Sequence, residues 1–403
     1  MKIGFAREII TPKFADRMAG FDRRTEPSVG TLDDLYASCV AMISDAGERA
    51  AFCVLDVLGT DRALSRKISE AVDADGVWVS ATHTHSAPSS VFTDRTAMSG
   101  GYREAVVEKC RLAAERAFAA AKPAVAGFAL SSVTGIASVR NVLRGASAFE
   151  MPLAAFRFET EDGPVSMVRY QCHPTVLNEK NLLYSKDILR GTHEGLPGKT
   201  LFMNGACADL STRYTRRAST PEEALRIGLV LADAVKSVEF RTDEAFGRTI
   251  SIRKKTLELQ RGPGADAAER ERLAACFRKK SAECEDENER REYDSILCLL
   301  ARGDAEAEPA RPVDLTVADF GTAVLAGLPF EVRHDDALRM EKTLTEAAGR
   351  PVWLAAYCGG YDGYLAGGDK LSENSSYEDF ASRYLPGTHG RIADALQELI
   401  GGK

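Results

Sequence analysis

The sequence predicts an α/β fold in which a mixed β-sheet core is flanked by helices. The chain has 403 residues, of which 44% are hydrophobic, enough to build a sizeable core. Short β-like runs at residues 50–60 and 77–86 alternate with a helical pattern at 103–123, an order typical of layered α/β proteins. Most of the β-like runs are rich in Val, Phe and Ala without clean alternation, which indicates strands buried between layers.

The later elements continue this alternation. A helix is expected at 220–238, where Thr220 can cap the N-terminus and Pro221 can occupy the first turn. Residues 313–332 are typical of a β-hairpin, and helical patterns follow at 335–349 and 389–400. Further strands are expected at 124–135, 153–160, 164–174, 199–211 and 352–365, the last of which runs into a Gly-rich loop.

Residues 261–312 differ in composition from the rest of the chain. They are dense in charge, with sparse apolar positions at helical spacing, and therefore predict a pair of surface helices. The charges fit either a solvated face or a lid or partner surface. Because the segment after 312 returns to core-like patterns, we expect one domain over 1–403, with 261–312 as a helical excursion within it.

Composition excludes several classes of function. The 52 Lys and Arg against 59 Asp and Glu give a net charge of −7, so no global positive field favours nucleic acid. No run approaches the ~20 apolar residues of a membrane span, and the first residues lack the pattern of an export signal. Nine cysteines without a CxxC pair do not suggest a disulfide framework or a thiolate metal site, and a reducing cytoplasm is expected.

Three of the six histidines follow β-like runs. His83 and His85 lie at the end of one run, where a strand would project both side chains to the same face. Such a pair can give two imidazoles to one cation, or one ligand and one proton-transfer group, although a solvent-facing pair without a role fits the same pattern. His173 ends another run before Pro174, as a metal ligand or as a core histidine with satisfied hydrogen bonds.

Two further groups of polar residues follow strand-like runs. Asn204, Asp209 and Ser211 lie where a β-like run breaks into small residues, and hydroxyl or N–H groups there can polarise a carbonyl or form an ordinary capped turn. Glu331 follows a long uncharged stretch, so its carboxylate must be paired, hydrated or bound to metal. Tyr361 and Tyr364, in the Gly-rich loop, can approach a site or pack against the surface. Together these side chains offer the ligand chemistry of an open Zn²⁺ site.

These motifs resemble the catalytic domain of the neutral/alkaline non-lysosomal ceramidases. The resemblance runs in family order through nearly the whole chain, although the sequence ends where that family has an additional C-terminal β domain. The matching segments are Thr82-His83-Thr84-His85-Ser86 with Pro88, His173-Pro174-Thr175, Ser185-Lys186-Asp187, the stretch with Asn204, Asp209 and Ser211, Glu331 after a Gly-Leu-Pro turn, Tyr361-Asp362-Gly363-Tyr364, and Tyr377-Glu378. The chain departs from the family pattern at Ala87, Ala208 and Thr212, which bear on the shape of the reacting pocket.

The resemblance implies a ceramidase-like fold, a bound zinc ion and a set of site residues. Its implied zinc ligands are His83, His173, Glu331 and Tyr364, with Tyr361 as the alternative tyrosine. Its implied catalytic residues are His85 beside the metal, Ser211 at the reacting centre, Arg140 in contact with the substrate, and Tyr377.

Zinc-dependent hydrolysis of an amide bond in a small N-acyl substrate is therefore the leading functional hypothesis. A metal-dependent esterase or lactonase is an alternative, because the same metal polarises either carbonyl. A catalytically silent binding protein on the same scaffold is another, motivated by the departures at 87, 208 and 212. An amidohydrolase barrel also begins with a His-x-His motif but needs further histidine ligands, and His193, His334 and His389 lie in poor contexts for that role. The sequence does not determine the oligomeric state.

Overall fold

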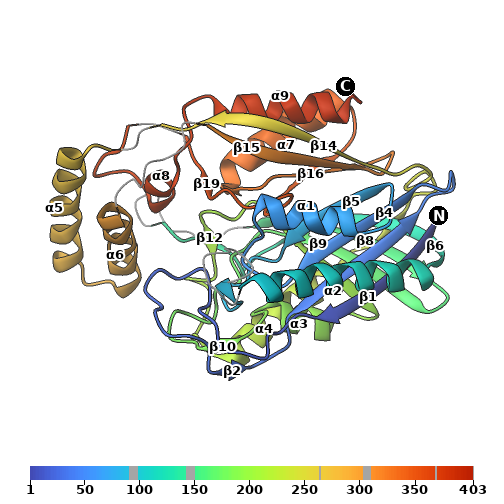
Figure 1. The fold of residues 1–403 in the computed structure, drawn as a ribbon, viewed down its shortest axis with the longest axis horizontal. Helices are drawn as coiled ribbons and strands as arrows, with labels where there is room; N and C mark the ends of the chain where they lie inside the picture. The colour runs from blue at the N-terminus through green and yellow to red at the C-terminus, as the bar shows by residue number, and fades with distance from the viewer. Residues whose placement is uncertain (90–98, 142–149, 263–264, 303–309, 368–369, 403) are drawn as a thin grey trace.

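A computed structural model describes residues 1–89, 99–141, 150–262, 265–302, 310–367 and 370–402. Two mixed β-sheets lie face to face, and helices cover the outer face of each (Figure 1). The predicted α/β fold with a mixed sheet flanked by helices is therefore confirmed. None of the helices in the described part of the chain is long and apolar enough to cross a membrane.

The larger sheet has nine strands. Along it lie β11 (Lys199–Asn204), β9 (Gly163–Tyr170), β8 (Met151–Thr160), β6 (Lys122–Val133), β1 (Lys2–Ile9), β3 (Tyr36–Ile43), β4 (Arg49–Leu55) and β5 (Gly76–Ala81), while β13 (Arg241–Thr242) pairs with β6. Strands β4 and β5, at one edge, are parallel, as are β9 and β11 at the other. The central pairs are antiparallel.

The smaller sheet has four strands, in the order β14 (Ser251–Gln260), β15 (Ala310–Asp319), β16 (Val324–Gly327) and β18 (Val352–Ala355). The hairpin predicted at 313–332 forms as the antiparallel pair β15 and β16. Three short pairs complete the strands: β2 (Gly30–Thr31) with β10 (Leu183–Tyr184), β7 (Ser138–Val139) with β12 (Leu210–Ser211), and β17 (Glu331–Val332) with β19 (Tyr364–Leu365). Strands β1, β3 and β14 were not among the predicted elements.

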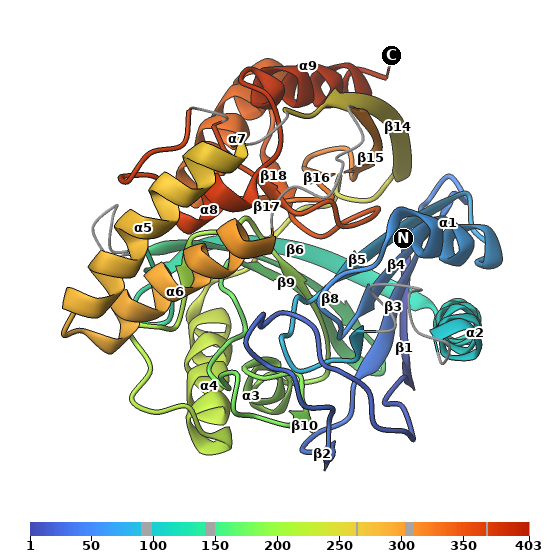
Figure 2. The ribbon, with the colours of Figure 1, turned by 60° about the vertical axis from the view of Figure 1, so that its left-hand side comes forward.

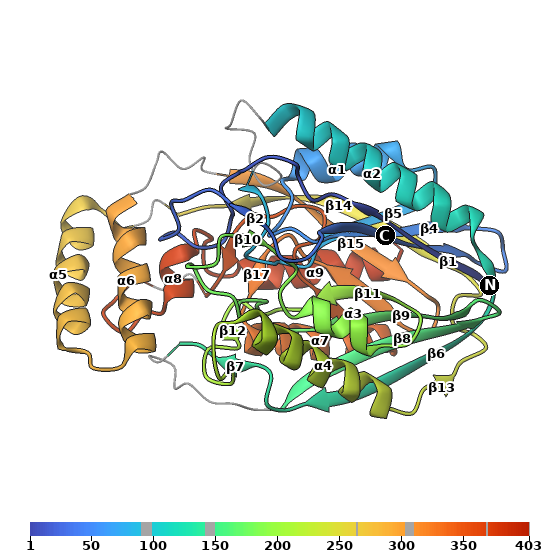
Figure 3. The same cartoon turned by 90° about the horizontal axis from the view of Figure 1, so that it is seen from below.

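The helices form the outer layers and one projecting pair. They are α1 (Arg62–Ala71), α2 (Ser99–Ala119), α3 (Leu189–Gly195), α4 (Pro221–Ser237), α5 (Ala267–Glu283), α6 (Glu287–Arg302), α7 (His334–Ala348), α8 (Tyr377–Ala381) and α9 (Thr388–Ile400). The cap predicted for α4 forms, because the Thr220 hydroxyl accepts a hydrogen bond from the Glu223 N–H. Helices α5 and α6, from the charged segment, stand together at one end of the molecule (Figure 3).

Three apolar layers hold these elements together. Phe52, Phe156, Phe320 and Trp353 pack between the two sheets. Helices α1 to α4 cover the other face of the large sheet, and α7 and α9 cover the small sheet, which gives the layer order α-β-β-α (Figure 2). Burial of both faces explains why the strand sequences lack clean alternation.

The large sheet curves so that its two edge strands meet. Strands β11 and β5 lie at opposite ends of the strand order, yet Asn204 Nδ2 at the end of β11 donates to Thr82 O, just past β5, at 3.2 Å. The backbone oxygen of Asn204 also accepts the Ala356 N–H at the end of β18, at 2.9 Å. The ends of strands from both sheets therefore converge at one place.

A buried ion pair joins the two sheets to α7. Arg169, on β9, is fully buried and contacts the Glu341 carboxylate at 2.5 Å and Leu354 O, on β18, at 2.8 Å. Glu341 also accepts the Leu354 N–H at 2.8 Å. The pair satisfies polar groups at the junction of three elements, so removing one partner leaves a buried charge uncompensated.

We therefore expect Arg169→Leu to lower the free energy of unfolding by about 3–5 kcal/mol. The double variant Arg169→Leu, Glu341→Leu should recover part of that loss, because no lone charge remains. Urea denaturation of the three proteins measures both effects. A single variant within about 1 kcal/mol of the wild type would show that the pair does not hold the sheets together.

Candidate metal centre

His83 lies in a short loop at the end of β5, and not on the strand as predicted. The strand ends at Ala81, and the backbone of His83 has a φ of +66°, in the left-handed region. The fully buried ring stacks on that of Tyr357, whose φ is also positive at +57°, with centroids 3.9 Å apart and planes at 10°. Two non-glycine residues in this uncommon conformation lie in direct contact, as is frequent at functional sites.

Backbone carbonyls fix the orientation of two imidazoles. His83 Nδ1 lies 2.8 Å from Leu58 O, and His173 Nδ1 lies 2.7 Å from Cys207 O. A carbonyl oxygen can only accept, so Nδ1 of each ring carries a hydrogen, which leaves Nε2 as the atom available to a metal ion. Metal-binding histidines are held in this way.

His85 completes a cluster of three imidazoles. Its Nε2 lies 3.4 Å from that of His83, and its ring centroid lies 5.4 Å from that of His173. Burial, followed by the neighbouring histidines, holds the pKa of His85 well below its usual range, and burial and Arg140 lower that of His173 to about 4. The pKa shifts favour the neutral forms of His85 and His173 at neutral pH.

Glu331 faces this cluster from β17. Its carboxylate oxygens lie 3.6 Å from His83 Nε2 and 3.1 Å from His173 Nε2, and its Oε1 accepts the Tyr361 hydroxyl at 2.5 Å. Burial raises the pKa of Glu331, but the two histidines more than offset it and hold the pKa well below the usual value. Positive charge beside it, from a protonated ring or from a bound cation, is therefore what keeps this buried carboxylate ionised.

These residues fit a divalent metal ion. The ligand nitrogens of His83, His85 and His173 all lie within 4.8 Å of one another, and all three residues are buried. His173 Nε2 and Glu331 Oε2 are buried without a hydrogen-bond partner although they face each other at 3.1 Å. A cation between them would satisfy both atoms, and imidazole with carboxylate is a ligand set that suits zinc.

A second cluster lies beside the first. Arg140 Nη2 donates to the Tyr364 hydroxyl at 2.9 Å, and Arg140 Nε lies 3.4 Å from the buried Glu378 carboxylate. The Tyr377 ring packs edge-on against Tyr364, with centroids 5.5 Å apart. Burial raises the pKa of Tyr364 well above its usual value, so the phenol keeps its proton in the absence of a metal.

The two predicted tyrosines thus contact different partners. Tyr361 contacts the carboxylate of Glu331, whereas Tyr364 contacts Arg140. The Tyr361 ring also lies near His83, with centroids 6.0 Å apart, whereas Tyr364 alone of the two lines the cavity described below.

Ser211 and Asp209 have different surroundings, although both lie near His173. Ser211, on β12, forms a parallel bridge with His173 and lines the cavity beside His85. Asp209 instead accepts hydrogen bonds from the backbone and the ring of His334 at the start of α7, at 2.9 and 2.7 Å. Asn204 joins strand ends and does not line the cavity.

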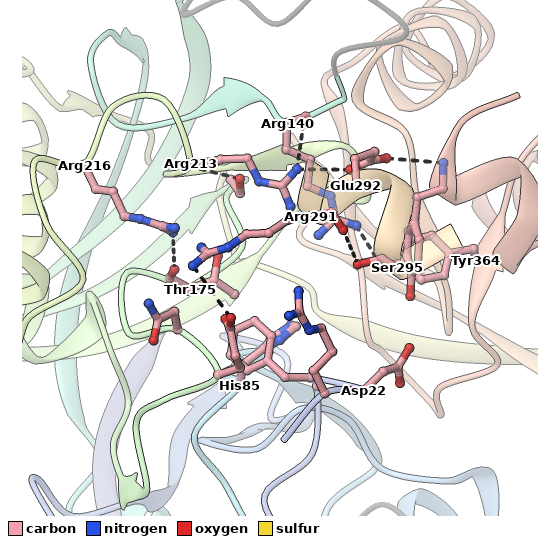
Figure 4. Close-up of a pocket in the computed structure, with 17 residues that line it drawn as sticks. Asp22, His85, Arg140, Thr175, Arg213, Arg216, Arg291, Glu292, Ser295 and Tyr364 are labelled. Carbon is pink, nitrogen blue, oxygen red and sulfur yellow. Dashed lines mark hydrogen bonds and ion pairs between the residues drawn. The ribbon is translucent and has the colours of Figure 1, made fainter. Parts of the chain in front are cut away.

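A cavity of about 120 Å³ opens beside the imidazoles (Figure 4). His85, Arg140, Ser211, Tyr364 and Tyr377, all candidates from the sequence, line it. Sequence analysis did not assign the rest of the wall to the site. It comes from the loop at residues 20–23, from Thr175, Asn178 and Glu179, from Arg213 and Arg216, and from three residues of α6. The charged composition of 261–312 predicted the helices and fitted either a solvated face or a lid or partner surface, so it did not decide whether one of them would border the site.

Comparison with solved structures gives two similar folds. One is a ceramidase complexed with C2, with a TM-score of 0.75 and 14% sequence identity. The other is neutral ceramidase from Pseudomonas aeruginosa, with a TM-score of 0.75 and 16% sequence identity. Each comparison covers 99% of this chain and 74% of the other. The chain has a ceramidase fold. The resemblance inferred from the sequence is thus confirmed for the fold, while no family model and no curated protein sequence matches the chain.

We expect added zinc to stabilise the protein. At a free concentration near 100 times the dissociation constant, a ligand bound only by the folded state raises the free energy of unfolding by about 2.7 kcal/mol. His83→Ala and His173→Ala should lose most of this gain. His389→Ala, which alters a histidine near Asp336 and outside the cluster, should keep it. Equal stabilisation of all four proteins, measured by denaturation with and without zinc, would contradict the assignment.

Proposed function

We propose that the protein is a zinc-dependent hydrolase that cleaves an amide bond in a small N-acyl substrate. The observation that carries this proposal is the convergence of three buried imidazoles and a buried carboxylate beside a cavity. The fold similarity to ceramidases supports the choice of an amide bond. Zinc bound there would polarise the substrate carbonyl and activate water.

His83, His173 and Glu331 would hold the ion. The proposed fourth ligand is Tyr364, with Tyr361 as the alternative. Tyr361 already contacts the ligand carboxylate, while Tyr364 lies on the side of the cavity.

The remaining residues would handle the proton and the developing charge. His85 lines the cavity and is neutral, so its ring can take a proton from the attacking water and return it to the leaving nitrogen. Arg140 and the Tyr364 hydroxyl, joined by a hydrogen bond, provide donors for an oxyanion unless the tyrosine binds the ion. Ser211 also lines the cavity and can donate to the substrate, and Tyr377 supports Tyr364 by ring contact.

An esterase or lactonase would use the same groups. Paired amide and ester substrates with the same acyl group separate the two activities. We expect the rate acceleration over the uncatalysed reaction to be larger for the amide than for the ester.

We expect His85→Gln to lower kcat by about 10²–10⁴-fold, the usual contribution of a general acid–base group. Zinc content, measured on the same preparation, should stay near that of the wild type. His389→Gln is the matched control and should leave kcat unchanged. A His85 variant with full activity, or one that loses zinc in proportion to activity, would contradict the proposed proton-transfer role.

The two tyrosines can be told apart by separate Phe substitutions. If Tyr364 is the ligand, Tyr364→Phe should weaken zinc binding by at least about 10-fold, whereas Tyr361→Phe should have a smaller effect. Competition with a chelator of known affinity measures both. The reverse order would assign the ligand to Tyr361.

A further inference from the structure

The walls of the cavity carry an excess of positive charge. Among the described residues that line it, five are arginines and three are carboxylates. The whole chain has the opposite balance, with a net charge of −7. A positive cavity in an acidic protein concentrates anions, because a cleft lined by one sign of charge focuses the field.

Most of these arginines have a carboxylate partner. Arg213 contacts Glu292 at 3.0 Å, Arg23 lies 3.5 Å from Asp294, and Arg140 pairs with Glu378. Arg291 contacts the exposed Glu287 at 2.9 Å and lies 3.7 Å from Glu179. These pairs hold the guanidinium groups in place around the cavity, and Figure 4 shows the pair between Arg213 and Glu292.

Arg216 differs from the others. Its Nη1 donates to Thr175 O at 2.7 Å, and in the described part of the chain no carboxylate lies within ion-pair distance of it. Burial, followed by repulsion from Arg213 and Arg291, lowers the pKa of Arg216. Arg216 therefore lies near two other guanidinium groups, and it lines the same cavity as His85 and Ser211.

The cavity lacks the features that a lipid chain needs. No aliphatic side chain is present among the described residues that line it, and its apolar surfaces come from Phe21, Tyr364 and Tyr377. Its volume of about 120 Å³ is below the ~300–1,000 Å³ of pockets for drug-sized ligands. A compact polar compound fits this space better than two long hydrocarbon chains.

We propose that the substrate is a small N-acyl compound that carries a carboxylate, such as an N-acyl amino acid, and that Arg216 binds this carboxylate with help from Arg213 and Arg291. The inference rests on the proposed amide hydrolysis and adds the class of substrate. The planar fork of a guanidinium matches a carboxylate in a bidentate pair. The carboxylate would supply the counterion that Arg216 lacks.

The test compares N-acetyl amino acids with their carboxamides, which have the same scissile bond without the charge. The zinc-loaded wild type should show kcat/KM at least about 10-fold higher for the carboxylates. Arg216→Gln should lower kcat/KM for the carboxylates by about 10–100-fold, mainly through KM. The loss of a charge-assisted hydrogen bond weakens binding by about this factor. Its kcat/KM for the carboxamides should change by less than about threefold.

Arg217→Gln is the matched control, because this neighbouring arginine is exposed and does not line the cavity. It should leave both substrates unaffected. The proposal would be overturned if Arg216→Gln lowered kcat/KM equally for carboxylates and carboxamides, or if the wild type preferred a short-chain ceramide to every carboxylate. Neither result would contradict the proposed hydrolase activity.

A binding measurement separates this proposal from the proposed activity. If no substrate is hydrolysed, the proposed hydrolase activity is refuted, and calorimetry then tests whether Arg216 binds a carboxylate. N-acetyl amino acids should bind the zinc-loaded wild type at least about 10-fold more tightly than Arg216→Gln, and their carboxamides should bind the two proteins equally. The absence of any difference between the two proteins would overturn the assignment of Arg216.

Discussion

The candidate metal centre depends on the hydrogen bonds from His83 Nδ1 and His173 Nδ1 to backbone carbonyls. Leu58 O and Cys207 O fix both rings and their tautomers, so that two Nε2 lone pairs point at the carboxylate of Glu331. The acceptors are backbone atoms in loops that follow β4 and β11. The geometry of the site therefore depends on where these strands end, and less on which side chains the residues with the accepting carbonyls carry.

The curvature of the large sheet brings those strand ends together. Asn204 bonds to Thr82 and Cys172 through its side chain and to Ala356 through its backbone, and so ties both edges of the large sheet to the small one. The Ala208 N–H donates to Val332 O at 3.1 Å, which holds β17 and its Glu331 close to the loop that follows β11. Helix α6, from the charged segment, then completes the cavity wall with Arg291 and Glu292.

Local patterns predicted much of the fold and several of the site candidates, while Arg140 and Tyr377 were implied only by the family resemblance. The alternation of β-like and helical runs, the cap at Thr220 and the hairpin at 313–332 needed only neighbouring residues. The strand assigned to His83 was wrong because its positive φ comes from tertiary contacts, including the stack on Tyr357. Among the described residues, four of the five cavity arginines, all except Arg140, were missed because their role depends on which partners surround each one, and a sequence does not contain that information.

Anomalous diffraction from crystals of the zinc-loaded protein, recorded on both sides of the zinc absorption edge, tests the central claim most directly. The account predicts one strong peak about 2.0–2.2 Å from His83 Nε2, His173 Nε2 and an oxygen of Glu331. A fully loaded crystal with its peak elsewhere, for example between Asp209, His334 and Asp335, which also lie close together, would contradict it.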